Sequence, residues 1–253
     1  EHLKQLEESG IHLVYTDLTH LRDSNPAYSG LWRTAFRWFG TAGTGWLPNP
    51  FSMDAPEVTL RSYLELFNFK ANHRKVLITE QEGILTSANP HDASALHSNI
   101  AFVVRGNILQ ELFESEKSAA VMSGAKPEWF DSYEIQSVGY ESDSQETYYA
   151  QLLTEGKIKK HLLQEIAETK EGDSIRISVF YLSDRNLVKE LLKAAERNVD
   201  VRLILDANKD AFGREKNGVP NRPVAHELLK QSNNQIQVRW YNTTGEQYHT
   251  KLA

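Results

Sequence analysis

Hydrophobic positions follow their most regular pattern in the second half of the chain. Apolar side chains at helical spacing predict amphipathic helices over 158–167 and 187–195. Apolar and β-branched runs predict strands over 175–182 and 199–205, one on either side of the second helix. Strand, helix and strand in this order form a βαβ unit, so we expect a partly parallel sheet covered by helices. A third helix, 224–230, and a further strand, 236–241, extend the same arrangement.

The first half of the chain is less regular. Short apolar runs predict strands over 11–15 and 100–104, and 76–85 predicts two strands joined through Gly83. The stretch 115–147 is rich in Ser, Glu and Gly and shows little periodicity, which predicts a linker.

Two segments resemble each other in length and pattern: IHLVYTD at 11–17 and IQVRWYN at 236–242. Each precedes a histidine motif, and if they are equivalent strands of two lobes, the counterpart of 158–235 would lie before Glu1. We therefore expect the chain to begin inside one lobe and to stop inside the other. Coincidence is the alternative explanation for so short a match.

Composition narrows the function classes. A chain of 253 residues with 40% hydrophobic residues can form one large domain or two moderate ones. With 34 acidic and 28 basic residues its formal net charge is −6, which gives no general attraction to a nucleic-acid backbone. Cysteine is absent, so disulfides and thiolate zinc sites are excluded. No apolar run is long enough to cross a bilayer, and the start does not resemble a signal peptide.

The candidate chemistry lies in two histidine and lysine pairs of equal spacing. If His73 and Lys75 lie in a strand, they project to the same face, because side chains alternate with period two. An imidazole can attack phosphorus, and an ammonium group can neutralise the phosphoryl oxygens in the transition state. His249 and Lys251 repeat the spacing after a comparable strand. One such pair is weak evidence, since a strand histidine is commonly a packing residue, but two pairs predict phosphodiester chemistry.

The motifs resemble those of the phospholipase D superfamily, H-x-K-x-x-x-x-D followed by G-S-x-N, once in each lobe. The first copy here reads HRKVLITE and then TSAN, with Glu80 in place of the aspartate, Thr86 in place of the glycine, and a gap one residue short. The family often adds an N-x-E pattern whose glutamate orients the histidine, but Asn99 is followed by Ile100 and Ala101. Glu80 or Asp92 would then have to orient His73. The second copy matches at its histidine and lysine, and the rest of it would lie beyond Ala253.

This resemblance implies an α/β fold of two pseudo-symmetric phospholipase D-like lobes, 1–140 and 141–253, each incomplete at one end. Each lobe would contain a mixed, partly parallel sheet flanked by helices, with the active site at the lobe interface. By analogy with lipid-cleaving relatives, His73 would attack phosphorus and His249 would act as general acid, without metal or cofactor. The implied catalytic residues are His73, Lys75, Glu80, His249 and Lys251, and the implied phosphate-binding residues are Ser87, Asn89, Lys75 and Lys251.

The resemblance also implies a phospholipid substrate at a membrane surface, with water or an alcohol as acceptor, as in phospholipase D and cardiolipin synthase. The stretch 31–40 (LWRTAFRWFG) mixes Trp32, Phe36, Trp38 and Phe39 with arginines, which would suit the lipid headgroup level, although ordinary packing of these aromatic side chains on their own lobe is the favoured interpretation. We expect membrane association, either peripheral or through a segment outside this sequence. A nuclease or another soluble phosphodiesterase is the alternative function, with nucleic acid the less favoured substrate, and a scaffold without turnover is a second alternative.

Overall fold

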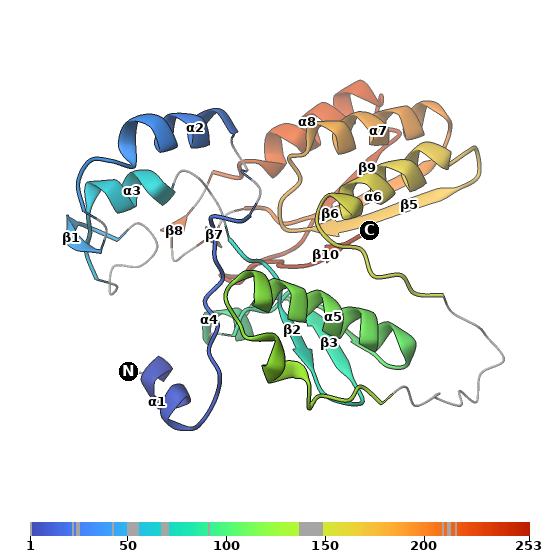
Figure 1. Cartoon of the computed structure of the whole chain (residues 1–253). Coiled ribbons are helices and arrows are strands. Elements are labelled where there is room, and N and C mark those ends of the chain that lie inside the picture. Colours follow the sequence, from blue (N-terminus) through green and yellow to red (C-terminus); the bar gives the residue numbers. More distant parts are fainter. Residues whose placement is uncertain are drawn as a thin grey trace. The chain divides into compact units, whose positions relative to one another are not determined.

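The computed structural model (Figure 1) describes residues 2–21, 23, 26–41, 43–49, 56–66, 71–90, 92–136, 149–208, 210–211, 214–215 and 217–253. Its contacts divide the chain into two compact units. Unit 1 comprises Glu1–Arg74 and Leu112–Glu134, and unit 2 comprises Lys75–Glu111 and Ile135–Ala253. These units are defined by contacts, whereas the two lobes expected from the sequence are defined by repeated motifs. The two lobes remain a prediction.

The larger sheet of unit 2 is the βαβ arrangement expected from the sequence. Its strand order is β10-β5-β6-β9, and β5, β6 and β9 are parallel while β10 runs antiparallel to β5. Helix α7 connects β5 to β6, and α8 connects β6 to β9. The bounds are α6 Gly156–Glu168, β5 Ser174–Val179, α7 Arg185–Glu196, β6 Asp200–Leu205, α8 Asn221–Gln231, β9 Gln237–Trp240 and β10 Lys251–Leu252. All the elements predicted between 158 and 241 are thus confirmed, with small shifts at their ends.

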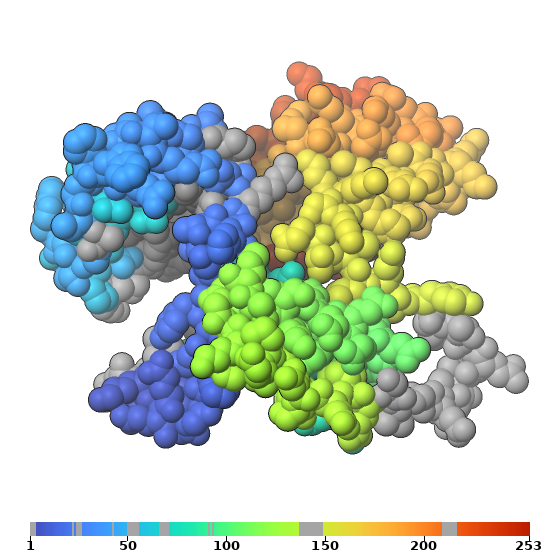
Figure 2. Space-filling view, in the orientation of Figure 1, coloured from blue at the N-terminus to red at the C-terminus, as the bar shows by residue number. Residues whose placement is uncertain are grey.

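Alternation along β6 explains where the core of this sheet lies. Val201, Leu203 and Leu205 are buried, whereas the residues between them point to the other face and are exposed. They pack with the apolar face of α7, which includes Val188 and Leu191. Truncating a fully buried leucine of this kind to alanine costs about 2–5 kcal/mol. Helices α6 and α7 contact each other and form part of the surface in Figure 2, where they are yellow and orange.

The other main sheet of unit 2 carries the first motif. Strands β2 (Val76–Ile78), β3 (Gly83–Thr86) and β4 (Ala101–Val104) are antiparallel neighbours in that order, which confirms the strands predicted over 76–85 and 100–104. The connection 79–82 is a turn, and so short a connection can only join antiparallel strands. The expectation of a partly parallel sheet therefore holds for the larger sheet and not for the described strands of this one. Unit 2 also contains α4 (Asp92–Ala95) and the hairpin β7 (Asp210–Ala211) and β8 (Arg214–Glu215).

Two predictions for the first half of the chain are wrong. Residues 11–15 form no strand; the Ile11 N–H donates to the Leu6 carbonyl at 3.1 Å, and the His12 ring stacks on Trp129 at 4.2 Å between centroids. The match between 11–17 and 236–242 is therefore not one of equivalent strands. Residues 115–122 are not linker but the end of helix α5, whose polar residues are interspersed with the buried Leu109, Leu112 and Phe113. Residues 137–148 of the expected linker lie outside the described residues.

Unit 1 is built mainly from short helices. Besides most of α5 (Asn107–Met122), it contains α1 (His2–Glu8), α2 (Pro26–Leu31), the π-helical turn η1 (Trp32–Phe36), β1 (Thr44–Leu47), α3 (Leu60–Leu66) and the 3-10 turn η2 (Pro127–Phe130). The mixed α/β class is confirmed for the chain. Of the helices described, none combines the length and the apolar character needed to cross a membrane.

Candidate active site

The segment that carries His249 is anchored to two parts of unit 2. The Ser98 N–H donates to the Gln247 carbonyl, and the His249 N–H donates to the Ser98 carbonyl, both at 2.9 Å. From the carboxyl end of β6, Oδ2 of the buried Asp206 accepts the Tyr248 N–H at 2.6 Å. These backbone contacts fix the direction in which the His249 side chain leaves the chain.

The imidazole of His249 is held as one tautomer. Its Nδ1 lies 2.9 Å from the Ser87 carbonyl oxygen, which can only accept, so Nδ1 carries the proton. The other ring nitrogen, Nε2, lies 3.3 Å from Lys251 Nζ. Since an ammonium group can only donate, Nε2 presents a lone pair. The two contacts therefore agree on a neutral ring with its lone pair at Nε2.

Asn99 supports the same ring nitrogen. Its Oδ1 lies 3.3 Å from His249 Nδ1 and accepts the Ser87 hydroxyl at 3.0 Å. Its Nδ2 donates to the carbonyls of Ser94 and His97, at 2.7 and 3.1 Å. A flipped amide would set oxygen against two carbonyl oxygens, so these contacts fix its orientation. The Ser87 hydroxyl also accepts the Ile100 N–H at 3.0 Å, and the residue is buried, so this hydroxyl is engaged within the protein.

The positive charges of Lys251 and Lys75 act on the His249 ring. Burial, then the charge of Lys251, and to a smaller extent the charges of Lys75 and His97, lower the pKa of His249 from 6.5 to about 4, against the opposing effect of the hydrogen bond to Ser87. Burial and the neighbouring Lys75 lower the pKa of Lys251 from 10.5 to about 8. Burial also lowers the pKa of Lys75. At neutral pH His249 is uncharged, and it lies in the field of two lysines.

Two further rings border His249. The Phe180 ring meets it edge to face, with centroids 5.4 Å apart, and the His97 ring lies 6.4 Å away at an angle of 47°. His97 Nδ1 accepts the Gln247 N–H at 3.2 Å, so the neutral ring carries its proton on Nε2. Neither Asn99 nor His97 was assigned a role from the sequence. Both residues lie about 150 positions before the His249 segment in the sequence, so no local sequence pattern could predict their contacts with it.

The first motif is built differently from its expected form. His73 is exposed and lies before β2, not within a strand. Asn72 Oδ1 accepts a hydrogen bond from the Arg74 N–H at 3.0 Å, which forms a side-chain turn at this point. The argument that strand alternation aligns His73 with Lys75 therefore does not apply. His73 belongs to unit 1 and Lys75 to unit 2, and the contact of the His73 ring with the second motif remains a prediction.

The remaining predicted site residues lie at different places in unit 2. Glu80 is exposed in the turn between β2 and β3, whereas Lys75 and Ser87 flank the open end of the same hairpin. The strands place the turn roughly 10–15 Å from that end, at about 3.4 Å per residue. The Asn89 N–H donates to Ser94 Oγ at 2.8 Å, and Asp92 begins α4. The structure thus brings Lys75, Ser87 and Lys251 to His249 and leaves Glu80 at the opposite end of the hairpin.

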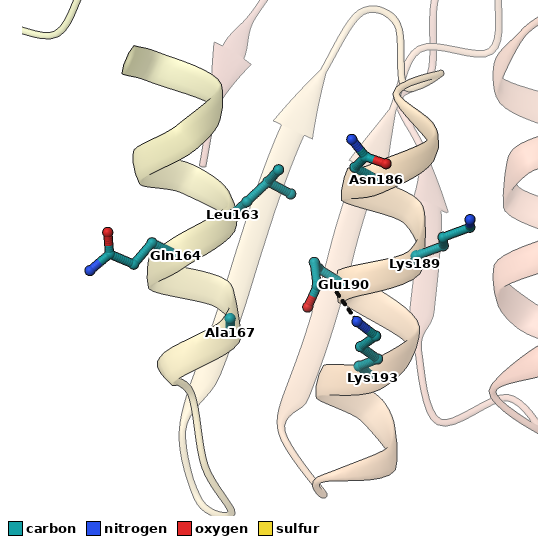
Figure 3. A pocket seen from close by; sticks show the side chains of 7 residues that line it. All are labelled: Leu163, Gln164, Ala167, Asn186, Lys189, Glu190 and Lys193. Carbon is teal, nitrogen blue, oxygen red and sulfur yellow. Dashed lines mark hydrogen bonds and ion pairs between the residues drawn. The ribbon is translucent and has the colours of Figure 1, made fainter. Parts of the chain in front are cut away.

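A groove between α6 and α7 (Figure 3) is lined by other residue types than those around His249. Its charged residues are Lys189, Glu190 and Lys193, and the last two form an ion pair at 2.7 Å. None of the residues that surround His249 lines it. Within the described ranges, no three His, Asp or Glu side chains lie close enough together to hold a metal ion.

A neutral imidazole whose lone pair faces the Lys251 ammonium group is suited to nucleophilic or acid–base chemistry on an anionic group such as a phosphodiester. Residues 162–253 match the family described as cardiolipin synthase, PLD-like domain. This segment is a phospholipase D-like domain, and the superfamily inferred from the motifs is confirmed. The match contains His249 and Lys251 and leaves out 73–89. Searches of curated proteins and of solved structures gave no match.

Proposed function

We propose that the chain is a phospholipase D-type phosphodiesterase or phosphatidyltransferase that acts on phospholipids through a covalent phosphohistidine. The observation that carries the proposal is the His249 ring, with its Nδ1–H on the Ser87 carbonyl and its Nε2 3.3 Å from Lys251 Nζ. The lone pair can reach a phosphorus atom whose oxygens are neutralised by Lys251 and Lys75. The paired motifs of the superfamily imply His73 as the second catalytic histidine.

The experiment that tests this proposal compares substrate classes. The purified chain is incubated with vesicles of mixed phospholipids and, separately, with single-stranded DNA, in the presence of water alone or with added glycerol. Release of a lipid headgroup, or its exchange for glycerol, is the expected result. Cleavage of DNA alone would identify the alternative, a nuclease. No turnover of either substrate or of an activated phosphodiester would favour the scaffold.

Lipid is favoured over nucleic acid by the net charge of −6 and by an exposed aromatic turn in unit 1. Of the four aromatic residues predicted to meet lipid, Trp32 is buried, while Trp38 and Phe39 are 72% and 73% exposed. The Trp38 indole N–H donates to the Arg33 carbonyl, and the guanidinium of Arg37 lies 5.6 Å from the Trp38 ring centroid. Exposed aromatic rings beside arginine suit the boundary between acyl chains and headgroups.

We therefore expect Trp38→Ser combined with Phe39→Ser to weaken binding to anionic phospholipid vesicles by about tenfold or more, because burying one such ring is worth about 1.5–3 kcal/mol. Co-sedimentation with vesicles measures the effect. Tyr149→Ser is the matched control, since Tyr149 is 96% exposed in unit 2 and outside this turn. Equal loss in the control and the double variant, or none in either, would contradict a role for the turn in membrane binding.

A further inference from the structure

The amine of Lys251 lies beside a base and not beside an acid. Its Nζ is 3.3 Å from His249 Nε2, which presents a lone pair, and 3.4 Å from the His249 carbonyl oxygen. Among the residues that the structure describes, no Asp or Glu forms an ion pair with it. Lys159, by contrast, is paired with Asp184 at 2.6 Å. A proton on Lys251 therefore has a nearby acceptor and no carboxylate to hold it.

Two effects favour the uncharged amine of Lys251. Its ammonium end is partly buried, and the positive charge of Lys75 repels it, so its pKa falls from 10.5 to about 8. At neutral pH the uncharged fraction is then about 100-fold or more above that of a lysine with an ordinary pKa. The residue as a whole is exposed, so a small molecule can reach it from solution. A lysine that is partly desolvated beside another cation is an activated nucleophile.

We infer that Lys251 is a modification site that is acylated by acyl phosphates, and that its acylation stops the chemistry of the neighbouring His249. An acyl phosphate combines a phosphate group with an acyl carbon that an amine can attack. Lys75, whose charge acts on both His249 and Lys251, neutralises the phosphate. All three side chains belong to unit 2. The effect on His249 rests on the proposed function, whereas the acylation does not.

The step balances as an acyl transfer. The uncharged Nζ of Lys251 attacks the acyl carbon, and the bond between that carbon and the bridging phosphate oxygen breaks. Phosphate leaves with the electron pair of this bond. The nitrogen keeps one hydrogen and gives its other proton to His249 Nε2, 3.3 Å away, from which the proton passes to water. The products are an amide on Lys251 and inorganic phosphate.

Acylation of Lys251 also changes His249. The amide is uncharged, so His249 loses the neighbouring positive charge that helps to keep its ring neutral. The oxygens of a bound phosphodiester lose one of the two lysines that would neutralise them. Both changes act against catalysis at His249, so acylation would regulate the site.

Acetyl phosphate tests the modification directly. The purified chain is incubated with it near neutral pH, and peptide mass spectrometry follows the acetylation of each lysine with time. We expect Lys251 to react at least about tenfold faster than Lys189, which is exposed on α7. An excess of inorganic phosphate should slow the reaction of Lys251 and leave that of Lys189 unchanged. With p-nitrophenyl acetate, an acyl donor without a phosphate group, the preference for Lys251 should be smaller.

A variant at Lys75 tests the surroundings of Lys251. Lys75→Ala should slow the acetylation of Lys251 by acetyl phosphate about tenfold, because it removes both the charge that lowers the pKa of Lys251 and the cation that faces the phosphate. Lys160→Ala, at an exposed position of α6, is the matched control and should leave the rate unchanged. If Lys75→Ala fails to fold, as circular dichroism would show, the preference in wild type and its protection by phosphate still decide.

The other outcomes are distinct. Equal rates at Lys251 and Lys189 would overturn the modification site, and an equal preference with both acyl donors would overturn its assignment to acyl phosphates. Neither outcome bears on the proposed function, which substrate cleavage tests separately. Cleavage of bis(p-nitrophenyl) phosphate should fall in proportion to the fraction acetylated at Lys251, and an unchanged rate would overturn the effect on His249. No cleavage by the unmodified chain would overturn the proposed function, and with it this effect, but not the modification site.

Discussion

The two histidine and lysine pairs share one spacing, but the chain builds them in different ways. Lys251 begins strand β10, and the backbone at His249 is hydrogen bonded: the His249 N–H donates to the Ser98 carbonyl, and the carbonyl of the next residue, Thr250, accepts the Phe180 N–H. His73 instead follows a side-chain turn at Asn72 and lies outside any strand. The comparison teaches that an H-x-K spacing identifies the residue types of a site, while the partners of each ring decide its proton state.

Among the tests that compare the two motifs, we expect the largest loss of activity from replacing their lysines. Lys251→Ala removes the ammonium group nearest to His249 Nε2 and should lower kcat/KM on bis(p-nitrophenyl) phosphate by about 100-fold to 1,000-fold. Lys75→Ala should cause a loss of similar order, because Lys75 acts on both His249 and Lys251. Lys189→Ala, in the groove of Figure 3, is the control and should change little. A normal rate in Lys75→Ala would mean that the first motif does not serve the His249 site.

We expect a smaller effect from a change at Asp206, which follows β6 and accepts a hydrogen bond from the segment of the second motif. The carboxylate of Asp206 is buried and accepts N–H groups from Tyr248 and Asn208, so Asp206→Asn sets an amide N–H against at least one of them. We expect the free energy of unfolding to fall by about 1–3 kcal/mol, measured by urea denaturation. Asp131→Asn, at an exposed turn, should remain within about 0.5 kcal/mol of wild type. Unchanged stability and activity in Asp206→Asn would show that this tie does not support the site.

The finest distinction is in the pH profile. If His249 must be neutral to attack, kcat/KM should rise with pH through about 4, where its ring loses a proton. It should fall again as the pH rises through about 8, where Lys251 loses its charge. Lys251→Ala should move the acid limb to higher pH, because removing a neighbouring positive charge makes the imidazolium easier to form. An acid limb that stays in place in this variant would mean that it does not report His249.

Much of the fold could be predicted because its signals are local. Helices α6, α7 and α8 and strands β5, β6 and β9 follow apolar spacing that is visible within ten or so residues. The strand predicted over 11–15 is wrong because its backbone joins no sheet, and the His12 ring stacks on Trp129 instead. Helix α5 was missed in part because Ser and Glu occupy its outer face, while few residues such as Leu112 and Phe113 are buried.

The residue types of the site could be predicted, but their arrangement could not. His249, Lys251 and Lys75 were identified from spacing and from resemblance, and the structure brings all three together. Asn99 was noted only because no glutamate follows it, and its contact with His249 depends on how two sheets meet. His97 carried no signal at all, since a single histidine outside a motif is usually a packing residue.

The pairing of Ser98 with residues 247–249 also bears on the order of folding. This contact spans about 150 positions of sequence, so it closes one of the longest loops in the chain, and long loops close slowly and at a high cost in chain entropy. Elements such as β2 and β3, or β5, α7 and β6, can form from neighbouring residues well before that. The Ser87 carbonyl and Asn99 should therefore meet His249 only after these local elements have formed.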